Sequence, residues 1–345
     1  MAASHSLGRL EQGASLVPNP ELLRRPTLQR EAQSTSALEG TYAPLDEVLA
    51  AEVMDSRTRS SALNEVINYI VAAERAFDWI ESGRPITGGL MTELHRVLVN
   101  GTAADNEEAG RVRRIQVVIG SRGGTVFESR FIPAPPGVAL ESAFSDLIQW
   151  IKPKQADDLD PIVKAAMAHY QFETLHPFND GNGRLGRLLI VLQLVSEDLL
   201  SHGLLSVSPW FERKRDEYQE LLAAVSATGD WNDWITFFAR GIEESARDTA
   251  SRMMDLLAIQ NRFHEKLRSA GARGVIRDIV DILIGSPSVT IPFLVSATGK
   301  TYPAVKSAVV KLEQLGILEE RAGTSPKLFR ALDVIGITSA PTRLF

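Results

Sequence analysis

Apolar residues along most of this chain recur every three to four positions, which is the period of an amphipathic helix. In residues 61–80, for example, Val66, Ile70, Ala73 and Phe77 make one face. The same period extends over residues 86–101, 138–152, 161–175, 208–225 and 229–267. The pattern therefore predicts a mainly helical protein.

Residues 112–136 break this pattern. Ile115, Val117 and Ile119 fall on every second position, and Gly123 and Gly124 provide a turn before a second extended stretch that ends in the sequence PAPP. A period of two residues before a glycine turn is typical of two paired strands. We expect a β-hairpin here, inserted between helices.

The last part of the chain has its own pattern. After the linker GARG at 271–274, helical patterns at 275–285, 290–299 and 301–318 are joined by short glycine turns, and residues 319–332 suggest two short strands around a turn. This order is that of a winged helix-turn-helix. From Arg273 to Arg330 the chain has eight basic and five acidic residues, a modest excess. DNA binding, dimerisation and target docking all stay open for this part.

At the other end, the prolines of residues 1–26 and their weak periodicity predict an extended arm. A short helix is expected to open at Thr27 and to close at Gly40. We divide the chain into residues 1–110, 111–270 and 271–345: an N-terminal helical region, a core with the hairpin, and the C-terminal helix-turn-helix.

Composition narrows the class of protein. A length of 345 residues suffices for about two or three domains. The absence of cysteine excludes disulfides and thiolate metal sites and fits a reducing cytoplasm. The start lacks the apolar core of a signal peptide. The apolar run 188–195 is too short for a membrane span and predicts a buried central helix. A net charge of -6 disfavours a nucleic-acid coat protein.

The candidate chemistry is concentrated in HPFNDGNGRLGR, residues 176–187. Its glycines permit a tight turn before a helix, and backbone amides at a helix N-terminus bind anions, phosphate above all. Asp180 is a suitable oxygen ligand for Mg²⁺. Arg184 and Arg187 share one helix face, from which guanidinium groups can bind phosphate. His176 is the candidate general base.

Each of these residues, taken alone, also has a purely structural interpretation. A histidine before proline, an Asp-Gly pair or a helical arginine is more often a turn or a surface charge. Gly181, Gly183 and Gly186 have the GxGxxG spacing of dinucleotide-binding proteins, but residues 161–175 predict a helix before them, not the required strand. A Walker-type phosphate loop is excluded because no lysine lies between Lys164 and Lys214.

The segment 176–187 resembles the signature HPFx[DE]GNGRxxR of the Fic family, with every fixed position present. The resemblance implies a protein adenylyltransferase that moves AMP from ATP onto a Ser, Thr or Tyr hydroxyl. It implies His176 as base, Asp180 as the Mg²⁺ ligand and Phe178 as the anchor of the loop. For the nucleotide it implies backbone amides of the loop, side chains of the motif and an adenine contact: Asn179, Gly181, Asn182, Gly183, Arg184, Arg187 and Tyr218.

Thr35 to Gly40, TSALEG, resembles the inhibitory motif [ST]xxxE[GN] that precedes the core in one class of Fic proteins. By this resemblance Glu39 pairs with Arg187, takes the arginine from the γ-phosphate and inhibits the enzyme. The same glutamate could position a water that reverses the modification. The plain alternative is a helix that only packs on the surface.

By the same resemblance the fold is mainly α, a Fic helical bundle with a β-hairpin flap and a C-terminal winged helix-turn-helix domain. The flap would bind an extended segment of a target protein by strand addition. Self-modification, a homodimer and a cytoplasmic location without membrane contact fit this class. The alternative function is a DNA-binding regulator whose core senses nucleotide, which an intact His176 and Asp180 disfavour because a sensor needs no base.

Overall fold

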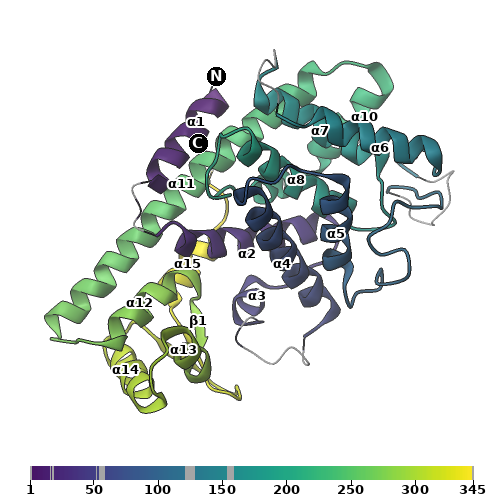
Figure 1. Cartoon of the computed structure of the whole chain (residues 1–345). Helices are drawn as coiled ribbons and strands as arrows, with labels where there is room; N and C mark the ends of the chain where they lie inside the picture. The colour runs from purple at the N-terminus through teal and green to yellow at the C-terminus, as the bar shows by residue number, and fades with distance from the viewer. Residues whose placement is uncertain are drawn as a thin grey trace.

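The computed structural model describes residues 2–15, 17, 19–51, 53, 59–120, 129–153 and 159–343. It is mainly helical, with one small sheet near the C-terminus (Figure 1). The described helices are α1 (Ala2–Ser15), α2 (Glu21–Leu38), α3 (Leu45–Ala51), α4 (Ser61–Glu81), α5 (Gly88–Val99), α6 (Val138–Trp150), α7 (Pro161–Leu175), α8 (Asn182–Ser196), α9 (Ser208–Arg213), α10 (Arg215–Thr228), α11 (Asn232–Ser269), α12 (Val275–Gly285), α13 (Ile291–Thr298), α14 (Tyr302–Gln314) and α15 (Leu332–Ser339).

Helix α8 is the centre of the bundle. Every residue from Asn182 to Val195 is buried, which confirms the buried helix expected from the apolar run 188–195. Helices α2, α4, α5 and α7 pack against it. Because α8 is covered on all sides, Arg184 and Arg187 near its start need hydrogen-bond acceptors inside the protein.

The predicted extended arm at residues 1–26 is wrong. Residues 2–15 form α1, which lies along the long helix α11 (Figure 1). Leu7, Leu10 and Ala14 occur at helical spacing and are buried there. The prolines that suggested an extended arm all lie C-terminal to this apolar face, so the helix ends before them.

Helix α2 begins at Glu21 rather than at Thr27 and contains Pro26. The backbone φ of proline fits a helix, and its cost is the lost amide hydrogen bond to Leu22. Gly285 of α12 packs at this point, where a Cβ would lie only 3.1 Å from the Leu22 carbonyl oxygen. The predicted end is confirmed: α2 stops after Leu38, and Gly40 follows with φ +88°.

The predicted hairpin is present only in reduced form. Ile119 and Phe131 form one isolated antiparallel bridge, and residues 112–118 are not a strand. The proposed turn at 123–124 lies outside the described residues. Side chains replace the strand pairing here: the Gln116 amide donates to the carbonyl oxygens of Val117 and Pro133 at 3.0 and 3.1 Å.

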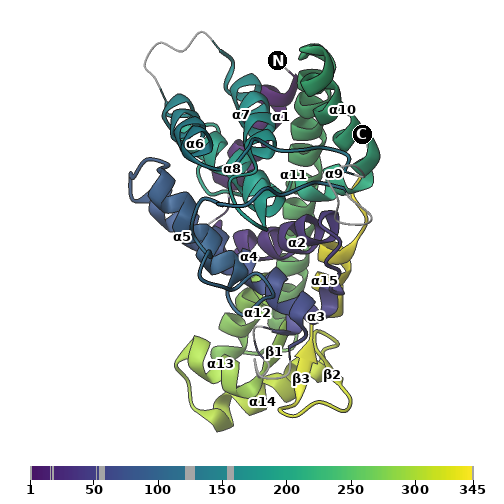
Figure 2. The same cartoon turned by 90° about the vertical axis from the view of Figure 1, so that its right-hand side faces the viewer.

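The C-terminal helices α12, α13 and α14 occur in the predicted order and pack with a three-stranded sheet (Figure 2). Its antiparallel strands are β1 (Ser288–Thr290), β2 (Glu319–Arg321) and β3 (Leu328–Arg330), in the order β1-β3-β2. The pattern did not predict β1, because a three-residue buried strand has no visible alternation. After β3, helix α15 returns to pack on α2 and α11. Among the described helices, none is long and apolar enough to cross a membrane.

We expect Leu10→Ala to lower the free energy of unfolding by about 3 kcal/mol, because Leu10 is fully buried between α1 and α11. Urea denaturation of the full chain measures this loss. Its exposed neighbour Arg9 supplies the control, since Arg9→Ala should change the value by less than about 0.5 kcal/mol. Equal losses in both variants would show that α1 does not depend on this face.

Candidate active site

The motif loop joins α7 to α8 by two left-handed residues. His176 ends α7 with φ 49°, and Gly181 precedes α8 with φ 73°. Asn182 starts α8, so the first amides of that helix face the loop without intrahelical partners. The predicted arrangement of helix, loop and helix is therefore observed, with a helix N-terminus at its centre.

The loop is held from inside by Asn182 and Phe178. The Asn182 amide accepts from the Phe178 N–H at 2.9 Å and donates to the Phe178 carbonyl at 2.8 Å. The Phe178 ring is fully buried and stacks on His95 at a centroid distance of 4.2 Å. The Asn182 side chain thus holds the loop by bonding to its backbone.

His95 of α5 acts as a second support, a role that sequence analysis missed. Its Nδ1 accepts from the Gly110 N–H at 2.8 Å, so its Nε2 carries the proton and donates to the Asp180 carbonyl at 3.0 Å. Burial lowers the pKa of His95 to about 4. The neutral ring thus satisfies both contacts and fixes the backbone at Asp180.

Arg113 supports the other end of the loop. Its buried guanidinium donates to the carbonyl oxygens of His176 at 2.7 Å, Ile115 at 2.9 Å and Leu175 at 3.2 Å, and also to that of Ala134. The arginine thereby ties the left-handed His176 to the start of the residue 112–136 segment. Nothing in the local pattern distinguishes Arg113 from the exposed Arg114 beside it.

Arg187, on α8, is buried against α2. Its Nε donates to Thr35 Oγ1 at 2.7 Å, and its Nη2 donates to the Thr35 carbonyl at 3.0 Å and to Glu39 Oε1 at 2.5 Å. The pairing of Glu39 with Arg187 that the resemblance implied is therefore present. Thr35, the first residue of the TSALEG motif, holds the guanidinium in position for it.

The Glu39 carboxylate also lies over the start of α8. A Cβ built on Gly183 would be 2.0 Å from Glu39 Oε1, so the carboxylate occupies the space in front of this glycine. Burial raises the pKa of Glu39, but the charge of Arg187 outweighs that effect and the pKa is lowered overall. An ionised carboxylate thus occupies the place that a helix N-terminus offers to an anion.

Arg184 has a different acidic partner, Glu65 of α4. Its Nη1 lies 2.9 Å from Glu65 Oε2, and the same oxygen accepts from Thr41 Oγ1 at 2.9 Å. Its contact with Asp180 is longer, at 3.5 Å. Glu65 therefore links a motif arginine to the residue that follows the TSALEG motif, a role that no sequence pattern indicated.

His176 and Glu173 are the titratable groups at the end of α7. Burial lowers the pKa of His176 to about 4, although the nearby Glu39 acts in the opposite direction. Burial raises the pKa of Glu173 to about 8, and its Oε2 lies 4.0 Å from His176 Nδ1. At neutral pH the imidazole is therefore uncharged and able to accept a proton.

A cavity of about 390 Å³ opens beside these groups. It is bounded by the end of α2, the arms of the 112–136 segment, the end of α7 and one face of α10, and its lining includes Glu39, His176, Arg187 and Tyr218. The Tyr218 hydroxyl is hydrogen-bonded to His169 Nε2 at 2.7 Å. The volume lies in the range of small-molecule sites.

The other predicted site residues, Asn179 to Arg184, lie in the motif loop and at the start of α8. They do not line this cavity. The side chain of Asp180 is 57% exposed, and its Oδ1 accepts from the Gly181 N–H at 2.7 Å. The Asn179 side-chain oxygen is buried and has no hydrogen-bond partner in the described part of the chain. In the same part there is no cluster of three or more metal-binding side chains.

Two family models match this chain. The model of the Fic/DOC family N-terminal region matches residues 1–78, and that of the Fic/DOC family matches residues 85–194. Together they include the TSALEG motif, the supports His95 and Arg113, and the whole motif loop. The chain belongs to the Fic/DOC family.

Two named relatives are similar in sequence to part of this chain. The protein adenylyltransferase fic-1 of Caenorhabditis elegans is 33% identical over 153 residues, which are 44% of this chain and 26% of that protein. The protein adenylyltransferase Fic of Nematostella vectensis is 32% identical over 183 residues, 53% of this chain and 37% of that protein. The chain thus spans well under half the length of these curated relatives.

Solved structures share the fold over a longer range. A Fic family protein from Desulfovibrio desulfuricans G20 superposes with a TM-score of 0.56 at 21% identity, covering 96% of this chain and 95% of the other. A fragment of Fic-1 from C. elegans has a TM-score of 0.56 at 25% identity, covering 73% and 72%. The similarity at the lower identity supports the fold alone.

Arg113→Met should lower the free energy of unfolding by about 3 kcal/mol, because several buried carbonyl groups lose a charged donor. Chemical denaturation measures the loss. Arg114→Met, a change at the exposed neighbouring position, should stay within about 0.5 kcal/mol of the wild type. If the two variants are equally stable, the carbonyl contacts of Arg113 do not hold the loop.

His95 should make the fold acid-sensitive. Its pKa is about 4 in the folded chain and about 6.5 when unfolded, so its contribution is complete above pH 6.5 and is lost as the pH falls towards 4. Between pH 7 and pH 4.5 the wild type should lose about 2 kcal/mol more than His95→Gln, which keeps a donor and an acceptor but does not titrate. Urea denaturation at both pH values measures this, and equal losses would contradict it.

Proposed function

We propose that this chain is a protein adenylyltransferase that moves AMP from ATP onto a Ser, Thr or Tyr hydroxyl of a target protein. The observation that carries the proposal is that His176, Arg187 and Glu39 line one cavity of small-molecule size, and that the Glu39 carboxylate lies over the N-terminus of α8. The names of the relatives from C. elegans and N. vectensis point in the same direction.

In the proposed reaction, His176 takes the proton of the target hydroxyl. The hydroxyl oxygen forms a bond to the α-phosphorus of ATP while the bond from that phosphorus to the β-phosphate oxygen breaks, and pyrophosphate leaves. The backbone amides from Asn179 to Gly183 bind the charged phosphate oxygens, while Arg184 and Arg187 hold the outer phosphates. Tyr218, on the cavity wall, is proposed to contact the adenine.

We propose Asp180 as the protein ligand of Mg²⁺. Its carboxylate is more than half exposed at the loop, and magnesium sites commonly use one or two carboxylates together with substrate phosphates. Bound there, the ion would neutralise phosphate charge. The single carboxylate fits this kind of site better than a metal site made entirely of protein ligands.

Glu39 is proposed to inhibit the enzyme in its resting state. Its carboxylate occupies the space before Gly183 and engages Arg187, both of which the reaction needs for phosphate. A water held by the same carboxylate could reverse the modification. The two arms around the Ile119 to Phe131 bridge are the proposed flap, on which an extended target segment adds as a strand.

The division at residues 110 and 270 and the winged helix assignment of the C-terminal part are likewise proposals. They are supported by the end of α11 at Ser269 and by the order of helices and strands after it. A cytoplasmic location and a homodimer are expected from the family resemblance. For DNA binding by this part, no contact of the described residues adds support beyond the modest excess of basic residues.

The proposal is tested by self-labelling of the full chain with ATP that is radioactive at the α-phosphate, in the presence of magnesium. We expect weak label in the wild type, at least about tenfold more in Glu39→Gly, and none above background in Glu39→Gly with His176→Ala, since a general base contributes roughly 100- to 10,000-fold. ATP labelled at the γ-phosphate is the control and should give no label. Label from the γ position, or label independent of His176, would contradict adenylyl transfer.

A further inference from the structure

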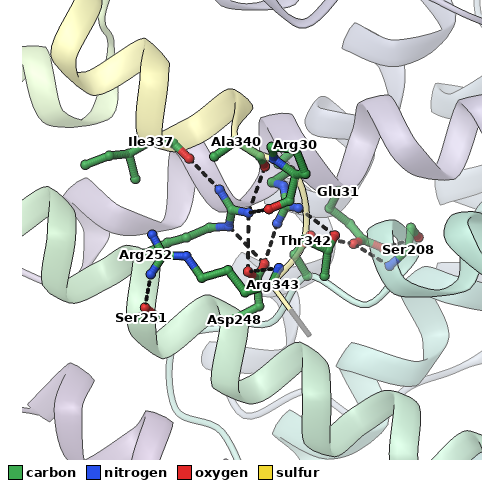
Figure 3. Close-up of polar contacts among 12 residues, drawn as sticks. Arg30, Glu31, Ser208, Asp248, Ser251, Arg252, Ile337, Ala340, Thr342 and Arg343 are labelled. Carbon is green, nitrogen blue, oxygen red and sulfur yellow. Dashed lines mark hydrogen bonds and ion pairs between the residues drawn. The ribbon is translucent and has the colours of Figure 1, made fainter. Parts of the chain in front are cut away.

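Helix α2, which ends in the TSALEG motif, is anchored by two buried charged side chains near its middle (Figure 3). Glu31 accepts hydrogen bonds from Ser206 Oγ and from the Ser208 N–H, both at 2.9 Å, and also from the Ser208 hydroxyl. Arg30 turns to the other side, towards α11. The hydrogen bonds of these two anchors go to α11, to Thr342 and to residues 206–208, and Arg187 acts on Glu31 only through its charge, so we assign the two side chains to the positioning of the helix.

Asp248 of α11 is the common acceptor for Arg30 and its neighbours. It accepts from Arg30 Nη1 at 2.7 Å, from Arg252 Nε at 2.9 Å and from the Arg343 N–H at 2.9 Å (Figure 3). Asp248 is 2% exposed, and Arg30 and Arg252 are each 7% exposed. Two buried guanidinium groups therefore share the one carboxylate of Asp248, and each needs further acceptors for its remaining N–H groups.

The segment after α15 supplies these acceptors. Arg252 Nη2 donates to the carbonyl oxygens of Ala340 and Pro341, both at 2.8 Å, and its Nη1 donates to that of Ile337. These carbonyls lie at and just beyond the negative end of α15. On the same segment, Thr342 Oγ1 accepts from Arg30 Nη2 at 2.8 Å.

Removal of residues 340–343 would leave Arg30 and Arg252 in mutual repulsion and short of acceptors. Burial and the charge of Arg252 both lower the pKa of Arg30, which agrees with a guanidinium that depends on every acceptor it has. Docking of this segment and docking of α2 on Asp248 are therefore coupled, and such coupling acts equally in both directions.

The coupling reaches the candidate active site along α2 itself. Thr35 and Glu39, which hold Arg187, lie on the same continuous helix and its C-terminal cap. The C-terminal part of the chain also contacts α2 from a second direction, where Gly285 of α12 meets Leu22. A shift of α2 away from α11 would pull Thr35 and Glu39 from Arg187.

We propose that the segment Ala340–Arg343 is a latch that keeps the inhibitory helix α2 docked, so that its displacement releases Arg187 and activates the site. The activation half of this inference rests on the proposed function. The docking half concerns the fold alone and is measurable without any enzymatic activity.

The test compares latch variants of the full chain with a matched control. Thr342→Val removes the Arg30 contact with little change of shape, and Arg343→Ala removes a half-exposed side chain that contacts Ser251 and Asp255. The control, Arg262→Ala, breaks the Arg262–Asp333 ion pair, which joins the same helices α11 and α15 at the surface.

Hydrogen exchange of the backbone amides gives the first readout. In the double variant Thr342→Val/Arg343→Ala, and to a lesser degree in each single variant, amides of residues 27–39 should exchange about tenfold faster, while those of α7 and α8 stay within about twofold of the wild type. Arg262→Ala should leave residues 27–39 unchanged. Unchanged exchange in residues 27–39, or an equal rise in α7 and α8, would overturn the latch.

Labelling from the α-phosphate gives the second readout. With Glu39 present, the double variant should raise self-labelling about tenfold, and in the Glu39→Gly background it should add nothing, because the inhibition is already removed. An equal rise in both backgrounds would overturn the link to Glu39. Absence of label in every variant, Glu39→Gly included, would refute the proposed activity, while the exchange experiment would still decide whether the latch exists.

Discussion

The ion pair between Glu39 and Arg187 is the interaction on which the rest of the structure depends. Arg187 is fully buried on the central helix, and a buried guanidinium is stable only when its donors are satisfied. Thr35 and Glu39 supply the acceptors from α2. The pair thus joins α2 to the motif, and it does so at the place where the proposed reaction puts a phosphate.

This arrangement explains why so many supports surround a short loop. A carboxylate can stand in for a phosphate only if the loop amides and both arginines keep their positions, and those positions are fixed from several elements. Asn182 and His95 hold the loop, Arg113 holds His176, and Glu65 holds Arg184. The site is therefore preorganised, and in the proposed inhibition Glu39 occupies it.

Part of the site could be predicted because it depends on local sequence: the spacing of the motif indicated the order helix, loop, helix. The pairing of Glu39 with Arg187, which lie 148 residues apart, was implied only by the resemblance of TSALEG to the inhibitory motif of the family. The supports could not be predicted, since Arg113 and His95 act through backbone carbonyls and amides that are remote in sequence. A local pattern does not show which distant carbonyl lacks a donor.

The wrong predictions for α1 and for the hairpin also arose because contacts between remote residues are not visible in the local sequence. Helix α1 was missed because prolines after it outweighed a short apolar face that needs α11 to be stable. The regular hairpin was overestimated because alternation was visible, while the competing side-chain contacts of Gln116 were not. The network around Asp248 joins residues of α2, α11 and the chain after α15, so it exists only in the folded protein.

The most direct measurement of the central claim is the affinity of the full chain for ATP and for ADP, determined by calorimetry in wild type and in Glu39→Gly. If Glu39 withholds Arg187 from the terminal phosphate, the wild type should bind both nucleotides about equally. Glu39→Gly should then bind ATP at least about tenfold more tightly than ADP, as one charged hydrogen bond to phosphate allows. A wild type that already prefers ATP, or a variant that gains no preference, would contradict the account.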